Sequence, residues 1–169
     1  VGAVAAIAVG IFALGNLEDR QAFIDAGAHV ARLHDTQYER FWNCALVNMN
    51  QAQIKSADDL EFQLDKRAAH FGKPYAATLD KCGGDLAAME RELATLSEPD
   101  ALHKATEALE KATADVRHAL QGLTDYLRTS GASYDPTGAK PYLEKLAKSW
   151  SAYGQVHTAF TDELRGHLQ

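Results

Sequence analysis

An apolar residue returns at every third or fourth position through residues 102–126. That spacing matches the 3.6-residue period of an α-helix, so the segment predicts one long helix with a single apolar face. Residues 75–96 and 143–164 carry the same pattern. Long helices with one apolar stripe and charged outer faces pack side by side at shallow angles, so these segments predict an antiparallel helical bundle.

Turn and cap signals divide the chain into five predicted helices, over residues 1–50, 57–71, 74–96, 99–129 and 138–168. Ser56, Ser97 and Asp135 are the expected N-caps, because a short side chain with an oxygen can accept a hydrogen bond from a first-turn amide. The glycine and proline in residues 72–74 predict a reversal of the chain direction. No segment of useful length alternates in the way that predicts a β-strand.

Residues 1–17 contain no charged side chain and are followed at once by Glu18, Asp19 and Arg20. As a helix this run would extend roughly 25 Å, close to the ~30 Å hydrocarbon core of a bilayer. We therefore predict a transmembrane anchor over residues 1–17 and a helical bundle over residues 18–169. An export signal and a buried core helix are the alternatives, but the run is apolar on every face, unlike the later helices.

Small residues recur every four positions within this run, at Gly2, Ala6 and Gly10. Because small side chains let two helix backbones approach closely in lipid, we expect the anchor to pack against other membrane protein subunits. No proline interrupts residues 1–51, so the first helix should leave the membrane and enter the bundle. The predicted fold class is all-α, with an N-terminal transmembrane helix continuing into an antiparallel bundle of four to five helices.

Two cysteines, Cys44 and Cys82, are the only ones in the chain. Few basic residues lie near the apolar run, which favours a bundle on the extracytoplasmic, periplasmic side of the membrane. Two core-facing cysteines in that compartment predict a disulfide, worth about 4 kcal/mol on the chain-entropy model. The bond requires the chain to reverse at residues 72–74, because one straight helix would hold the two cysteines far apart. Two inert buried thiols are the alternative.

The charge pattern excludes several classes of function. With 17 basic and 23 acidic residues the net charge is −6, and no Lys/Arg cluster occurs, so we expect no nucleic-acid partner. Two carboxylate-x-x-His motifs, at residues 100–103 and 115–118, lie on one helix about 22 Å apart and cannot share a metal ion. No metal site, cofactor or catalytic residue is predicted, and no nucleotide-binding or nucleophile motif is present.

These observations favour a non-catalytic accessory or structural subunit of a membrane protein complex. The alternative is an extracytoplasmic ligand-binding or sensor bundle that holds a small molecule between helices near His157, Trp150 and Phe41. His157 is the one histidine on an apolar stripe, where it is expected either to form a buried hydrogen bond or to act as a ligand or pH-sensitive contact. The sequence points to no particular small-molecule substrate.

Overall fold

The computed structural model describes the backbone of residues 2–47, 49 and 51–169, and within these ranges the side chains from Leu17 onward. The described residues are all-α and contain no strand. In chain order the elements are α1 (Gly2–Leu33), the π-helical turn η1 (His34–Tyr38), α2 (Glu39–Ala45), the 3₁₀ turn η2 (Gln51–Gln53), α3 (Ala57–Phe71), α4 (Tyr75–Ala94), the 3₁₀ turn η3 (Asp100–Leu102), α5 (His103–Thr129) and α6 (Pro136–Leu168).

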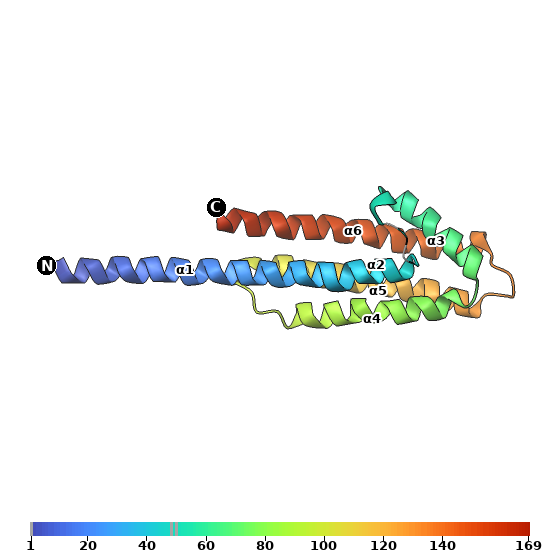
Figure 1. Cartoon of the computed structure of the whole chain (residues 1–169), viewed down its shortest axis with the longest axis horizontal. Coiled ribbons are helices and arrows are strands. Elements are labelled where there is room, and N and C mark those ends of the chain that lie inside the picture. Colours follow the sequence, from blue (N-terminus) through green and yellow to red (C-terminus); the bar gives the residue numbers. More distant parts are fainter. Residues whose placement is uncertain (1, 48, 50) are drawn as a thin grey trace.

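Four long helical segments lie side by side, each antiparallel to the neighbours it contacts (Figure 1). The first of them consists of α1, η1 and α2, which follow one another along a single axis. It packs against α4 and α6, and these two helices also flank α5. The fifth helix, α3, is shorter and packs mainly against α6. The predicted antiparallel bundle is therefore confirmed.

The apolar stripes meet in one continuous core. Phe41 and Trp42 from α2, Leu86 and Met89 from α4, and Val116 from α5 are all 1% exposed or less. Each stripe predicted from the sequence lies on the buried face of its helix, with the charged positions outside. Packing of the helix faces thus follows directly from the 3.6-residue period.

Two of the three expected N-caps form. Ser56 Oγ accepts a hydrogen bond from the amide of Asp59 at 3.1 Å, and Asp135 Oδ1 accepts one from the amide of Thr137 at 3.0 Å. The prediction for Ser97 was wrong, because the chain enters α5 through the 3₁₀ turn η3, which has no side-chain cap. Pro99 directly before η3 has no amide hydrogen and needs no partner there.

The first helix ends earlier than predicted, at Ala45 rather than near residue 50. The Tyr75 hydroxyl donates a hydrogen bond to the carbonyl of Ala45, and Arg67 Nε donates one to the carbonyl of Leu46 at 2.7 Å. These two side chains, from α4 and α3, satisfy carbonyls that a helix end leaves without an intrahelical partner. Val47 then adopts a positive φ of 56°, which turns the chain away from the helix axis.

The expected reversal between α3 and α4 is confirmed. Gly72 ends α3 with a φ of 59°, a left-handed conformation that glycine adopts without the steric cost of a β-carbon. Its amide still donates to the carbonyl of Ala68 at 2.8 Å, which closes the last turn of α3. The chain then enters α4 at Tyr75 and runs back along the bundle (Figure 1).

The predicted anchor over residues 1–17 falls almost entirely outside the described side chains, and so do its small residues Gly2, Ala6 and Gly10. Within the part of the chain that the structure describes, no helix is both long and apolar enough to cross a membrane. The anchor and its packing face therefore stay predictions.

Candidate functional site

Cys44 of α2 and Cys82 of α4 form the predicted disulfide, with their Cα atoms 5.6 Å apart. Cys82 is 1% exposed and Cys44 is half-buried, so the bond lies at the edge of the core. A disulfide of this kind is typical of an oxidising, extracytoplasmic compartment. Next to Cys82, a β-carbon on Gly83 would meet Cδ2 of Leu120 on α5 at 3.0 Å.

Beside the disulfide-linked helices, four rings form a stack that we call the aromatic–histidine cluster: His34, Tyr38, Tyr153 and His157. Tyr38 and Tyr153 have ring centroids 3.7 Å apart with 16° between their planes. His34 and His157 have centroids 4.2 Å apart with 17° between their planes. The cluster joins the first helix to α6, with two rings from each.

The π turn η1 creates this arrangement. Its hydrogen bonds span five residues instead of four, and its residues Gln37 and Tyr38 are both buried. The same turn brings His34 and Glu39, five residues apart, to one face, with His34 Nε2 3.3 Å from Glu39 Oε1. The other ring nitrogen of His34, Nδ1, lies 3.0 Å from the hydroxyl of Tyr153.

Burial dominates the electrostatics of the cluster. It lowers the pKa of His157, and the neighbouring His34 lowers that pKa further, while Asp35 and Glu39 act weakly in the opposite direction. Burial also raises the pKa of Tyr153, so its hydroxyl stays protonated at physiological pH. The hydroxyl can therefore donate to or accept from His34 according to the tautomer of the imidazole.

A surface depression of about 630 Å³ opens next to the cluster. Three stretches of chain surround it: the π turn with Glu39, the residues that lead into α3, and the middle of α6. Its walls combine aromatic rings with an acidic and two basic groups; the lining side chains include His34, Tyr38, Glu39, Lys55, Trp150 and Tyr153. Volume and lining fall within the range of small-molecule sites.

The sequence placed a possible ligand site near His157, Trp150 and Phe41. Trp150 lines the depression, and His157 stacks on His34, which also lines it. Phe41 is fully buried, contacts Trp42 and does not line the depression. His34 and Tyr38 were missed, although a signal exists: His34 and Tyr38 are four residues apart, as are Tyr153 and His157, which puts two rings on one helix face in each case.

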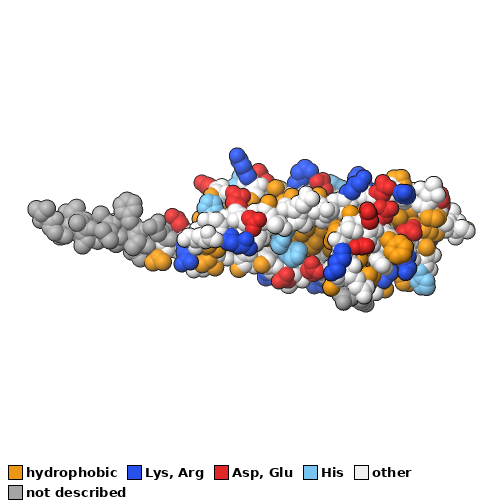
Figure 2. Space-filling model, turned by 90° about the horizontal axis from the view of Figure 1, so that it is seen from above, with side chains coloured by type: hydrophobic (Ala, Val, Ile, Leu, Met, Phe, Trp, Pro, Cys, Tyr) orange, Lys and Arg blue, Asp and Glu red, His pale blue; other side chains and the backbone are white. Residues whose placement is uncertain are grey.

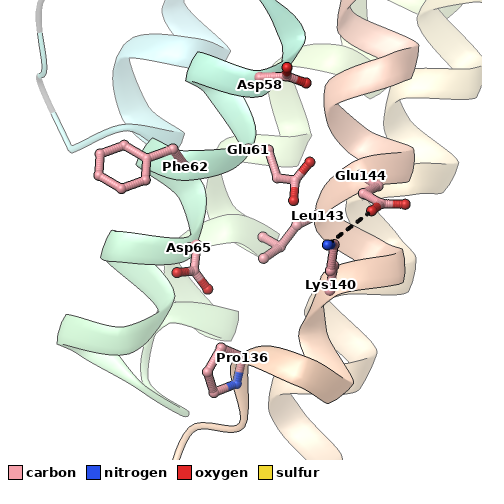
Figure 3. A pocket seen from close by; sticks show the side chains of 8 residues that line it. All are labelled: Asp58, Glu61, Phe62, Asp65, Pro136, Lys140, Leu143 and Glu144. Carbon is pink, nitrogen blue, oxygen red and sulfur yellow. Dashed lines mark ion pairs between the residues drawn. The ribbon is translucent and has the colours of Figure 1, made fainter.

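An acidic cleft of about 490 Å³ lies between α3 and α6 (Figure 3). Four carboxylates line it, Asp58, Glu61 and Asp65 from α3 and Glu144 from α6, and Lys140 Nζ lies 3.8 Å from Glu144. Burial raises the pKa of Glu61, and the negative charge of Glu144 raises it further. Among the described residues, no three His, Cys, Asp or Glu side chains are arranged to hold a metal ion.

The two carboxylate-x-x-His motifs are solvated surface, because Asp100, His103, Asp115 and His118 are all exposed. His103 Nδ1 lies 2.9 Å from Glu98 Oε1, and Asp115 accepts a hydrogen bond from Lys111 at 2.6 Å. Each motif is thus engaged in its own local contacts. On the face shown in Figure 2, basic and acidic side chains are interspersed.

No family model, curated protein or solved structure matches this chain. Its function is therefore argued from its own residues and geometry.

Proposed function

We propose that this chain is a non-catalytic accessory or structural subunit of a membrane protein complex. Residues 1–17 anchor it in the membrane, and residues 18–169 form a bundle on the extracytoplasmic side. The observation that carries this proposal is the disulfide between Cys44 and Cys82, which favours an oxidising compartment and joins the end of the first helix covalently to α4.

The first helix also supports a fixed relation between anchor and bundle. It continues from Gly2 to Ala45 through the π turn, so residues close to the anchor and residues of the core belong to one element. Val30, Leu33 and Phe41 along it are 1% exposed or less, which holds this element in the bundle. A continuous helix between anchor and bundle suits a structural role better than a flexible linker would.

Affinity purification of the full chain from its host membranes in mild detergent tests the proposal. With a Gly10→Leu variant, the recovered amount of co-purifying membrane proteins should fall at least about tenfold, because a bulky side chain blocks close backbone approach in lipid. Val4→Leu, on the opposite face of the helix, is the matched control and should keep them. Equal recovery with both variants, or a protein found fully soluble with residues 1–17 intact, would contradict the proposal.

A second candidate function is binding of a small molecule in the depression beside the aromatic–histidine cluster. Its volume of about 630 Å³ and its mixed aromatic and ionisable lining support this reading. Native mass spectrometry of the chain purified from its host should then show a bound mass. Gly154→Trp, within the depression, should abolish that mass, whereas Gly84→Trp, at an open position on α4, should leave it. A protein without added mass would argue against this function.

A further inference from the structure

We propose that the stacked rings of His34 and His157 form an acid-sensitive latch between the π turn and the C-terminal part of α6. When both rings are neutral the latch is closed. When both carry a proton, the two positive charges repel each other and α6 is released from η1. This device is independent of the proposed function, since it depends only on contacts within the bundle.

The closed state follows from the geometry of the pair. The two imidazoles are nearly parallel with centroids 4.2 Å apart, and His34 also stacks on Tyr38 and lies 3.0 Å from the Tyr153 hydroxyl. Neutral imidazoles at this separation are in favourable contact. Two imidazoliums at the same separation repel strongly, since charges about 4 Å apart near a protein surface interact far more than in bulk water.

The surroundings of the two histidines are unequal. A protonated His34 has Glu39 Oε1 3.3 Å from its Nε2, so one positive charge can be balanced. Within the described part of the chain no carboxylate forms an ion pair with His157; Asp35 and Glu39 act on it only from a greater distance. Lys55 lines the neighbouring depression, among the residues that lead into α3. In the closed state, the positive charge of a protonated His157 is therefore not balanced by an ion pair.

The direction of the pH effect follows from burial. Burial and the neighbouring His34 lower the pKa of His157 below its ordinary value of 6.5, so the opened or unfolded chain binds the proton more readily than the closed state does. The closed state of the latch is therefore most stable above about pH 6.5 and loses stability as the pH falls below that value.

Urea unfolding of the full chain in detergent, at pH 7.5 and pH 5.0, tests the latch. Between these two conditions the unfolding equilibrium constant of the unmodified protein should rise severalfold more than that of His157→Phe. The phenylalanine ring can still stack on His34 but cannot bind a proton. His118→Phe removes an exposed imidazole and should respond like the unmodified protein. Equal pH responses of His157→Phe and the unmodified protein would overturn the proposal.

Two measurements on the unmodified chain decide the question if His157→Phe does not fold. In an NMR titration the His157 ring should change its protonation state below pH 6.5, and a midpoint at or above that value would overturn the latch. In hydrogen exchange, corrected for intrinsic rates, amides of residues 154–168 should lose protection at pH 5.0 while those of α4 keep it. Unchanged protection of residues 154–168 would also overturn it.

Discussion

A β-carbon on Gly27 of α1 would overlap Cδ2 of Leu164 on α6, so the absence of a side chain at this position lets the two helices pack. Gly27→Ala should destabilise the protein by about 1 kcal/mol, because displacing a packed side chain costs ~1–3 kcal/mol and outweighs the ~1 kcal/mol that alanine gains in a helix. Gly84→Ala, where nothing lies within 4 Å, should instead stabilise by about 0.5–1 kcal/mol. Urea denaturation of both variants measures the difference, and a Gly27→Ala protein as stable as Gly84→Ala would show that Leu164 moves freely.

Reduction of the disulfide should lower the free energy of unfolding by about 2–4 kcal/mol, since Cys44 and Cys82 are 38 residues apart and the bond restricts the unfolded chain. Denaturation with and without a thiol reductant measures this loss. The double variant Cys44→Ala, Cys82→Ala is the control and should show no response to reductant. If the reductant destabilised that variant equally, the loss of stability would not come from the disulfide.

Tyr75→Phe should destabilise by about 1–2 kcal/mol, because the Tyr75 hydroxyl caps the carbonyl of Ala45 and its removal leaves a buried acceptor without that donor. The ring itself is retained, so packing should be unchanged. Tyr142→Phe, at a side chain 38% exposed, is the matched control and should fall within about 0.5 kcal/mol of the unmodified protein. Equal stabilities of the two variants in chemical denaturation would mean that Ala45 finds another partner.

Glu61→Gln should stabilise the protein at pH 7 by about 0.5 kcal/mol, because it removes one charge from the acidic cleft. Burial and the charge of Glu144 raise the pKa of Glu61 above its ordinary value of 4.5, so the folded protein holds this proton more tightly than the unfolded chain does. The cost of the ionised carboxylate is therefore complete at neutral pH and disappears as the pH falls toward 4.5. Stability curves for both proteins should converge at acidic pH; a constant gap from pH 7 to pH 4 would contradict this origin.

The helix faces, most helix bounds and the disulfide could be predicted from the sequence because each depends on local spacing. The stripe containing Leu86 and Met89 has one period and one buried face, and the reversal at Gly72 has its own signal. The disulfide then followed, because only that reversal brings Cys82 back to the level of Cys44.

The aromatic–histidine cluster could be predicted only in part, because the four-residue spacings place two rings on one face of each helix but do not bring the two pairs together. It depends on the π turn at His34–Tyr38, and a helix with a constant 3.6-residue period places neither His34 nor Tyr38 correctly relative to the later residues. The early end of the first helix was also missed, because it depends on Arg67 and Tyr75, which come from other helices. Both features are decided by tertiary contacts rather than by local propensity.

The bond between Cys44 and Cys82 also determines how a mechanical force would travel through the molecule. A pull on the N-terminal end of α1 passes along the first helix and crosses directly into α4 through a covalent bond. The intervening loop and α3, which packs mainly against α6, carry none of the tension. The covalent path from the N-terminal helix to α4 therefore bypasses α3, and this link under load does not depend on the contacts of that helix.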